Sequence, residues 1–465
     1  MPARILQYSD VENAYDRPER IGRLAGLIEE LRDEETLVVG TGDTIAPGVL
    51  SLVTEGRQAM DFFARVEPDL ATFGNHDFDH GPDATRGIVA DAPQTWVATN
   101  VYQSEGPPGG TIGNAADRFG ADAGVVPTAI REVAGTRLGF LGVLDPATPE
   151  VTPTASDLVV TDPVEATRRA TADLRARGAD QVVTLSHVGR SDDEIARETD
   201  VDVVLGGHVH ASRIDRIEGT LLTRPGANAR RLVELRYVAG DWSVDLHDVT
   251  GAPIEETVAG ALRERVANAG LDATVATVDR PIERTDDAVF SGPCRIGQVV
   301  AGAYRWATGT DVGLQNSGGI RAGPPLAGEV TVADLVSVIP FEEPVVVVEL
   351  SGRELRAVLA ERDGRALDPV PDDRWMGHAS GVAESDASRG EIVVDGAAID
   401  PGETYTLATS DYLCYTDGEF PTLTGRDPVE RTGRSQYEVL VDYAHERDLH
   451  GGRRADGATP RPDNG

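Results

Sequence analysis

Lysine is absent from the 465 residues of this sequence, so all 43 basic side chains are arginine. Acidic residues number 78, which gives a formal net charge of −35. A surface this acidic repels itself in dilute buffer, whereas at molar salt the Debye length falls to about 3 Å and the repulsion is screened. Removing lysine also shortens the apolar stems exposed to water. We therefore expect a halophilic protein from a salt-rich cytoplasm, of the kind found in halophilic archaea.

Cysteine, long apolar runs and basic patches are also scarce. The two cysteines, Cys294 and Cys414, cannot form a disulfide framework, and we interpret both as small buried residues in a reducing compartment. No run of about 18 apolar residues could span a bilayer, and the start has no secretory pattern. No basic face is available for nucleic acid. We expect a cytoplasmic protein that binds neither nucleic acid nor membrane, with its oligomeric state left open.

Hydrophobic residues make up 40% of the chain, enough for the cores of two or three domains. In residues 1–250, short apolar strands alternate with segments of helical spacing, and polar residues follow the strand ends. This pattern predicts an α/β layered domain with its site at the carboxyl edge of the strands. We expect a linker helix and hinge at 251–285, a second domain at 286–447, and a disordered tail at 448–465.

Side chains with metal-binding chemistry follow five strand ends of the first domain. These stretches are Asp10-Val11-Glu12, Gly42-Asp43, Gly74-Asn75-His76-Asp77, Ser186-His187 and Gly207-His208-Val209-His210. Residues two apart on an extended segment point to the same side, so Asp10 and Glu12 can share one cation. His208 and His210 can share a site or divide between two. We predict two divalent cations, a pair that clamps a phosphoryl group and activates water.

The stretch from residue 70 to residue 79 also carries groups for proton transfer. Gly74 frees the backbone after an apolar strand, and Asn75 offers a carbonyl oxygen suited to bridging cations. His76 can donate a proton to a phosphate oxygen, and Asp79 can hold its ring. Each such turn alone is often structural. Five of them in a fixed order favour a metal-dependent phosphohydrolase, and the lack of cysteine disfavours a structural zinc site.

In this order the motifs resemble those of the calcineurin-like metallophosphoesterases. The resemblance implies a four-layer α/β sandwich, two sheets flanked by helices, with His76 and Asp79 as the catalytic pair. The metal ligands it implies are Asp10, Glu12, Asp43, Asn75, His187, His208 and His210. Glu12 stands where that family normally has histidine. A carboxylate there hardens the first site, so we expect Mn²⁺ or Mg²⁺ to be favoured over Zn²⁺ or Co²⁺.

The second domain contains the motif Asn316-Ser317-Gly318-Gly319-Ile320-Arg321 after a strand. Its glycines let the backbone approach a ligand, and the Arg321 fork suits a phosphate. Further on, the segment 410–420 places aromatic residues beside acids, which suits a base and ribose hydroxyls, although such aromatics are often part of a core. This order resembles the C-terminal domain of the 5′-nucleotidase family, over roughly residues 4–445.

The second resemblance implies an α/β nucleotide-binding domain and a hinge rotation between domains. The substrate-binding residues it implies are Asn316, Gly318, Gly319, Arg321, Trp375, Tyr412 and Asp417, with Met376 as an alternative to Trp375. We expect the substrate to be a small molecule, a nucleoside 5′-monophosphate, which is hydrolysed to nucleoside and phosphate. Alternative substrates are 2′,3′-cyclic nucleotides, UDP-sugars and nucleoside di- or triphosphates. A catalytically idle nucleotide-binding sensor is an alternative of a different class.

Overall fold

The computed structural model describes residues 2–103, 118–364, 374–384, 392–416, 419–447 and 449. The chain divides into two compact units, residues 1–269 and 270–465, each with cores of its own. No helix in the described ranges is long and apolar enough to cross a membrane.

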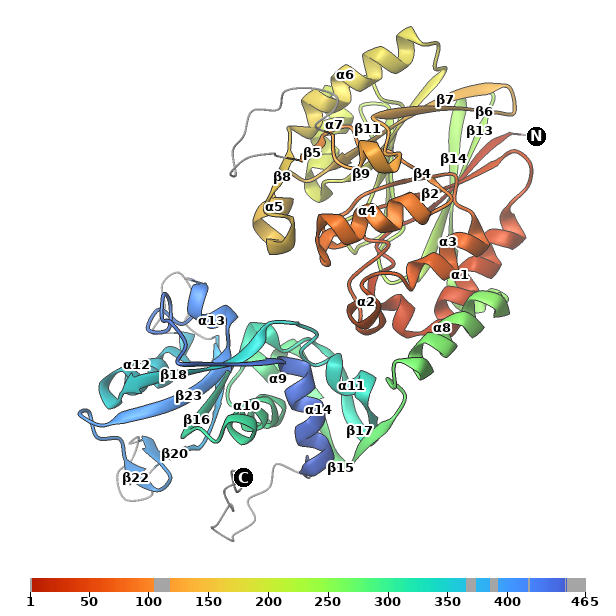
Figure 1. Cartoon of the computed structure of the whole chain (residues 1–465). Helices are drawn as coiled ribbons and strands as arrows, with labels where there is room; N and C mark the ends of the chain where they lie inside the picture. The colour runs from red at the N-terminus through yellow and green to blue at the C-terminus, as the bar shows by residue number, and fades with distance from the viewer. Residues whose placement is uncertain are drawn as a thin grey trace. The chain divides into compact units, whose positions relative to one another are not determined.

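Two six-stranded sheets form the centre of the first unit (Figure 1). In the order β14-β13-β1-β2-β3-β4, the first contains β14 (Asp241–Asp248), β13 (Arg231–Val238), β1 (Ala3–Tyr8), β2 (Thr36–Thr41), β3 (Leu70–Thr72) and β4 (Thr95–Trp96). In the order β11-β12-β10-β9-β7-β6, the second contains β11 (Arg213–Ile217), β12 (Thr220–Arg224), β10 (Val203–Gly206), β9 (Gln181–His187), β7 (Thr136–Leu144) and β6 (Thr128–Val133). Apolar side chains of both sheets, such as Val39 and Leu205, share one buried core. The sheets therefore pack face to face.

Helices cover the outer faces of this sandwich. On the first sheet, α3 (Ala59–Val66) places Phe62 against Tyr8 of β1 and Phe63 against Trp96 of β4, with ring centroids 5.4 and 6.2 Å apart. Helices α1 (Pro18–Leu31) and α8 (Glu256–Asn268) lie beside α3. On the second sheet, α6 (Pro163–Ala176) and α7 (Asp192–Glu198) bury their apolar faces. The predicted four-layer α/β sandwich is confirmed.

Shorter elements complete the first unit. They are α2 (Val49–Thr54), α4 (Gly81–Asp91), α5 (Thr148–Val151) and the strand pair β5 (Val101–Gln103) and β8 (Leu158–Val160). The Gly-, Pro-, Asp- and Ala-rich composition of residues 103–124 predicts an exposed insertion loop, but of this range only residues 103 and 118–124 are described, and there Phe119 is fully buried against Phe73 and Phe78. Phe119 therefore belongs to the aromatic support of the 73–79 turn rather than to an exposed loop.

A five-stranded sheet forms the second unit, in the order β19-β16-β23-β18-β24. Its strands are β19 (Gly377–Ser380), β16 (Val312–Asn316), β23 (Thr404–Ser410), β18 (Pro344–Ser351) and β24 (Glu430–Ser435). Helices α10 (Arg295–Thr308) and α14 (Gln436–Glu446) share a core on one face, and α12 (Gly352–Glu361) packs on the other. The smaller elements are β15 (Thr274–Arg284), α9 (Asp286–Phe290), β17 (Gly323–Thr331), α11 (Val332–Val336), β20 (Val382–Glu384), β21 (Ile392–Val394), β22 (Ala397–Ala398) and α13 (Tyr412–Tyr415). The second unit is an α/β domain, as predicted.

The expected linker range 251–285 contains parts of both units. Helix α8 packs on α1 in the first unit, whereas β15 pairs with β17 in the second. Of the expected tail, only Leu449 is described, and it is fully buried in the core beside α10 and α14. Both cysteines are free thiols; Cys414 is buried and Cys294 is half-buried.

Candidate metal centre

The predicted ligands follow the carboxyl ends of parallel strands in both sheets. Strands β1, β2 and β3 run parallel in the first sheet, as do β9 and β10 in the second. Four predicted ligands have the left-handed backbone that side chains rarely adopt, with φ of 47° at Asp10, 49° at Glu12, 50° at Asp43 and 68° at His208. Such conformations cluster at functional sites, where the surrounding structure holds them in place.

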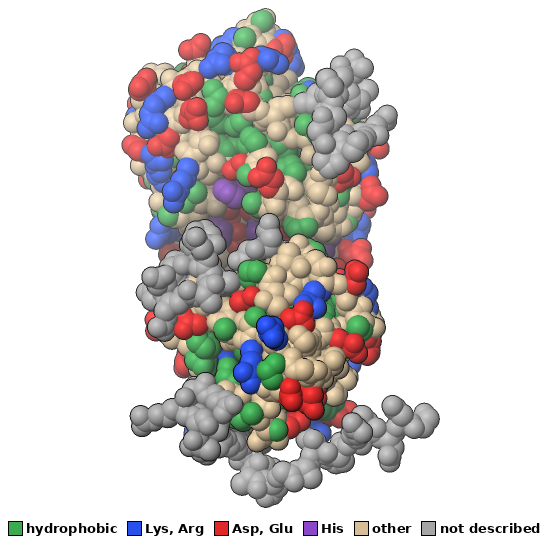
Figure 2. All heavy atoms as spheres, turned by 90° about the vertical axis from the view of Figure 1, so that its left-hand side faces the viewer, with side chains coloured by type: hydrophobic (Ala, Val, Ile, Leu, Met, Phe, Trp, Pro, Cys, Tyr) green, Lys and Arg blue, Asp and Glu red, His purple; other side chains and the backbone are tan. Residues whose placement is uncertain are grey.

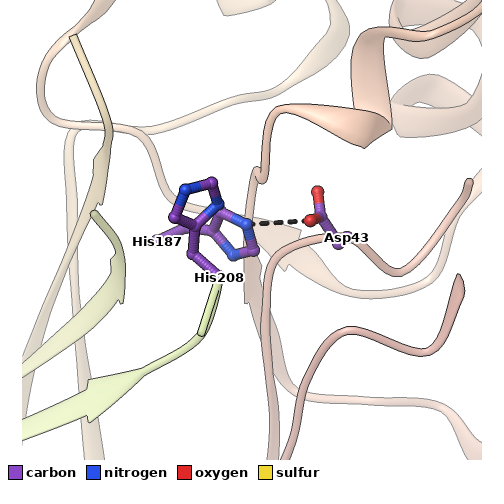
Figure 3. Close-up of side chains that lie close together, drawn as sticks. All are labelled: Asp43, His187 and His208. Carbon is purple, nitrogen blue, oxygen red and sulfur yellow. Dashed lines mark hydrogen bonds and ion pairs between the residues drawn. The ribbon is translucent and has the colours of Figure 1, made fainter. Parts of the chain in front are cut away.

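One group of potential ligands consists of Asp43, His187 and His208, whose ligand atoms lie within 4.8 Å of one another. Figure 3 shows Asp43 pointing at the His187 ring, and Nε2 of His187 lies 3.0 Å from Oδ2 of Asp43. Nδ1 of His187 donates to the carbonyl of Thr41 at 2.8 Å, which leaves Nε2 as the ligand atom. Nδ1 of His208 lies 3.0 Å from Oδ1 of Asn75, so the predicted Asn75 ligand borders the same group.

The second group consists of Asp10, Glu12 and His210, again with ligand atoms within 4.8 Å of one another. Nε2 of His210 lies 2.8 Å from Oε1 of Glu12. We predicted that Asp10 and Glu12 lie on one extended segment. This prediction was wrong, because Glu12 begins a 3₁₀ helix, Glu12–Asp16. The left-handed turn at Asp10 and Glu12 brings the two carboxylates together instead. His208 and His210 divide between the two groups.

The electrostatics of these groups suit divalent cations. Burial raises the pKa of Asp10 to about 7, and the charges of Asp43 and Glu12 add to the rise while His187 and Ser9 oppose it. For His187, burial alone would lower the pKa, but the Asp43 carboxylate outweighs it and raises the pKa to about 10. Carboxylates crowded away from water need positive charge beside them. Oxygen and imidazole donors without sulfur fit Mn²⁺, Mg²⁺ or Zn²⁺.

The predicted catalytic pair lies next to these groups. Nδ1 of His76 lies 2.9 Å from Oδ2 and 3.1 Å from Oδ1 of Asp79, and the His76 backbone N–H donates to Oδ1 of Asp43 at 2.8 Å. Burial would lower the pKa of His76, but the bond to Asp79 and the charge of Asp43 raise it to about 9. Because Nδ1 faces Asp79, Nε2 is the nitrogen left to meet a substrate oxygen.

Asp77 has a structural part in the site that the sequence did not assign to it. Its carboxylate accepts from the backbone N–H groups of Asp43 (3.0 Å), Thr44 (2.8 Å), Ile45 (2.9 Å) and Gly74 (2.7 Å). Two loops that carry ligands are thus held by one buried carboxylate. Asn75, His76 and Asp79 in the same stretch are all predicted site residues, so the motif alone does not distinguish the structural part of Asp77 from theirs.

A buried ion pair behind the ligands was also missed. Nε of Arg224 lies 2.9 Å from Oδ2 of Asp192, and Ser186 donates to Oδ1 of the same carboxylate at 2.6 Å. Ser186 precedes His187, and Arg224 and Asp192 are both buried. An arginine at the end of an apolar strand was the signal that could have pointed to this pair, since a buried charge needs a partner.

The predicted substrate residues lie in the second unit. Asn316 ends β16, and Gly318 and Gly319 form the turn after it. Nη1 of Arg321 donates to the carbonyl of Gly318 at 3.2 Å, and its guanidinium stacks on Phe341, 4.6 Å from the ring centroid. Two further predicted residues, Trp375 and Tyr412, also contact neighbouring side chains.

The guanidinium carbon of Arg362 lies over Trp375, 5.6 Å from the centroid of the Trp375 ring. Met376, the alternative to it, is buried at 8% exposure. Tyr412 meets Tyr415 edge to face, with centroids 5.7 Å apart. Asp417 lies outside the described residues. The roles of all these residues in substrate binding stay predictions.

Comparisons with known proteins agree with this geometry. A family model described as calcineurin-like phosphoesterase matches residues 3–212, and one described as 5′-nucleotidase, C-terminal domain, matches residues 273–425. The two-sheet sandwich and its ligand groups thus define a hydrolase of phosphoester bonds. The chain belongs to the 5′-nucleotidase family, which joins a calcineurin-like metallophosphoesterase domain to a 5′-nucleotidase C-terminal domain.

Individual relatives are distant. Endonuclease YhcR of Bacillus subtilis is 25% identical over 95% of this chain and 39% of its own length. The trifunctional nucleotide phosphoesterase protein YfkN of the same organism is 21% identical over 89% of this chain and 32% of its own length. The chain therefore spans about a third of these relatives. The crystal structure of a 5′-nucleotidase precursor from Thermus thermophilus has a TM-score of 0.70 at 21% identity, covering 96% of both chains.

Proposed function

We propose that this protein uses two divalent metal ions to hydrolyse nucleoside 5′-monophosphates to nucleoside and phosphate. The observation that carries the proposal is the pair of ligand groups, Asp43-His187-His208 and Asp10-Glu12-His210, beside the His76–Asp79 pair. When bound, the cations supply a Lewis acid for the phosphoryl oxygens and a water of lowered pKa.

The protein side chains have distinct parts in this reaction. Asp79 holds Nδ1 of His76, so that Nε2 faces the phosphoryl group and stabilises charge on its oxygens or gives a proton to the leaving oxygen. Asp43 contacts both the His76 backbone and the His187 ring, so it fixes the spacing between the catalytic histidine and the metal ligands. In the second unit, the Asn316–Arg321 turn and the aromatic residues support binding of the nucleoside.

Salt is part of the proposal because of the net charge of −35. On the face that Figure 2 shows, acidic side chains are spread over both units with basic side chains between them. Several of the described arginine–carboxylate pairs, such as Arg57–Asp91 and Arg216–Asp241, are exposed on both sides and contribute little stability in water. We propose that the protein works in concentrated salt, where the self-repulsion of this surface is screened. The same charge disfavours a polynucleotide as substrate.

A substrate panel crossed with metals tests the proposal. The protein is stripped with a chelator, dialysed into molar KCl and reloaded with Mn²⁺, Mg²⁺, Zn²⁺ or Co²⁺. Product formation is then followed by chromatography with AMP, UMP, ADP, ATP, UDP-glucose and 2′,3′-cyclic AMP, because UDP-glucose and the cyclic nucleotide release no free phosphate in their first hydrolysis step. We expect the highest kcat/KM for a nucleoside monophosphate. Faster turnover of a cyclic, diphosphate or triphosphate substrate would move the assignment within the family. No turnover combined with tight nucleotide binding would favour the sensor.

A further inference from the structure

The carboxylate of Glu419 lies against the glycine turn of the second unit. Its Oε2 accepts a hydrogen bond from Nδ2 of Asn316 at 2.7 Å. A Cβ built on Gly318 would lie 3.2 Å from Oε1 of Glu419 and 3.7 Å from Nδ2 of Asn316. A ligand atom placed over the bare Gly318 would therefore meet both groups at once. Asn316 is buried, whereas Gly318 and Glu419 are only half-buried, so this position is open to solvent.

A chain of buried amides and a phenol continues behind Asn316. Nε2 of Gln315 donates to Oδ1 of Asn316 at 2.8 Å, and the hydroxyl of Tyr304 lies 2.7 Å from Oε1 of Gln315. The same hydroxyl lies 2.7 Å from Oε1 of Gln436. Gln315, Tyr304 and Gln436 are at most 3% exposed, so water does not compete for these bonds.

The charge of Glu419 orients the amides of Asn316 and Gln315. An ionised carboxylate can only accept, so the Asn316 amide must turn its NH₂ group toward it. Oδ1 of Asn316 must then accept from Gln315, which leaves Oε1 of Gln315 to accept the single proton of Tyr304. Oε1 of Gln436 is a second acceptor within reach of the same hydroxyl proton. A neutral partner at position 419 would leave both orientations of Asn316 open.

Burial and two neighbouring polar groups act on the Glu419 carboxylate in opposite directions. Burial raises the pKa of Glu419, whereas the bond from Asn316 and the charge of Arg374 oppose that rise. Arg374 itself is held over Phe290, 3.8 Å from the ring centroid. The position over Gly318 is thus lined by one anionic acceptor and one amide N–H that is not used by Glu419.

We propose that Glu419 determines substrate specificity by binding a hydrogen-bond donor of the nucleoside over Gly318 and by orienting the Asn316 amide toward the same group. The inference rests on the proposed function, because it takes the ligand to be a nucleotide. The donor is either a sugar hydroxyl or an N–H of the base, and both suit a carboxylate beside an amide N–H. A lost bond to a charged group costs about 1.5–3 kcal/mol, which corresponds to roughly a 10- to 100-fold change.

The test uses the full chain in molar KCl and compares Glu419→Gln with Glu349→Gln, a control at an exposed position of β18. Adenosine binding is measured by calorimetry, and KM and kcat are measured for AMP and for p-nitrophenyl phosphate, which has no nucleoside. We expect Glu419→Gln to weaken adenosine binding and raise the KM for AMP by at least about tenfold. A smaller loss is expected with p-nitrophenyl phosphate, and no change with the control variant. Asn316→Ala is expected to reproduce the selective loss.

Substrate analogues identify the donor. If a sugar hydroxyl binds Glu419, the difference between wild type and Glu419→Gln disappears with the 2′- or 3′-deoxynucleotide. If the base binds it, the difference disappears with the purine nucleotide that lacks the exocyclic amine. Normal adenosine binding by Glu419→Gln, or an equal loss with both substrates, would overturn the inference alone. Failure of the wild type to bind any nucleoside while it hydrolyses p-nitrophenyl phosphate would instead reject the proposed function, and the inference with it.

Discussion

Nδ1 of His208 and Oδ1 of Asn75 lie 3.0 Å apart, although His208 follows a strand of one sheet and Asn75 follows a strand of the other. The candidate site is therefore built across the sandwich rather than on one sheet. Gln7 of β1 also links the two sheets, because its Nε2 donates a hydrogen bond to the carbonyl of Gly206 at the end of β10, at 2.9 Å. The ligand positions therefore depend on how the two sheets pack.

Replacing His76 tests the catalytic pair. His76→Ala is expected to lower kcat for AMP by roughly 10²- to 10³-fold while the metal content stays unchanged, because His76 donates no atom to either ligand group. Asp79→Asn, which keeps a hydrogen-bond partner for Nδ1, should cost less. Steady-state kinetics with metal analysis by mass spectrometry checks both variants, and an unchanged kcat for His76→Ala would reject its assigned part.

Glu12→His tests how the carboxylate at this position sets metal preference. Imidazole in place of carboxylate makes the Asp10-Glu12-His210 group softer, so we expect the variant to retain more Zn²⁺ relative to Mn²⁺ than the wild type. Competition dialysis of the two ions, read by mass spectrometry, measures the ratio. A neighbouring exposed change, Asn13→His, serves as the control because Asn13 lies outside the group. An identical ratio in wild type and Glu12→His would contradict the prediction.

Asp77→Asn should destabilise the first unit without removing a ligand. The substituted amide presents an NH₂ group to a pocket of four backbone N–H donors, so at least one of them loses its acceptor. We expect a loss of about 3 kcal/mol in the free energy of unfolding, together with weaker metal retention. Urea denaturation measures the loss. Asp83→Asn, whose side chain is 94% exposed, is the matched control and should change stability by less than about 0.5 kcal/mol.

His378 should make the stability of the second unit depend on pH. Its Nδ1 accepts from the backbone of Cys294 at 3.4 Å, and burial, aided by the charge of Arg362, lowers its pKa to about 4. The unfolded chain therefore takes up this proton first, so the stabilisation is complete above about pH 6.5 and is lost as the pH falls toward 4. We expect a loss of about 2 kcal/mol between about pH 7 and pH 5.

Urea denaturation of the second unit at constant molar salt measures this pH dependence. His378→Gln removes the titrating group, so its free energy of unfolding should change less over the same range than that of the wild type. Equal slopes in the two proteins would assign the pH dependence to other residues.

The order of strand-end motifs was sufficient to name the candidate ligands, but it left open how His208 and His210 divide between the two groups. Parallel strands bring their carboxyl ends to one edge, so residues as distant as Asp43 and His187 could be placed together from the sequence. The local backbone could not be predicted in the same way. The left-handed turns at Asp10 and Glu12 depend on contacts such as the bond from the Asn228 backbone to the Asp10 carbonyl at 2.7 Å, which lies far along the chain.

Supporting residues were harder to predict than the ligands. Asp192 and Arg224 pair across 32 positions, and nothing near either residue marks the partner. Glu419 was visible in the sequence as an acid among aromatics, but its bond to Asn316 joins residues 103 positions apart. Sequence patterns report which face of a strand is buried, whereas these contacts follow from how loops of different strands meet.

All candidate ligands lie within residues 1–269, and the second unit has separate cores around α10 and α12. A cation that binds only the folded first unit stabilises that unit alone, by about 2.7 kcal/mol when its concentration is a hundred times its dissociation constant. Calorimetry with increasing Mn²⁺ should therefore move one melting transition upward while the other stays in place. The distance between the two transitions would then report cation affinity directly, without any substrate.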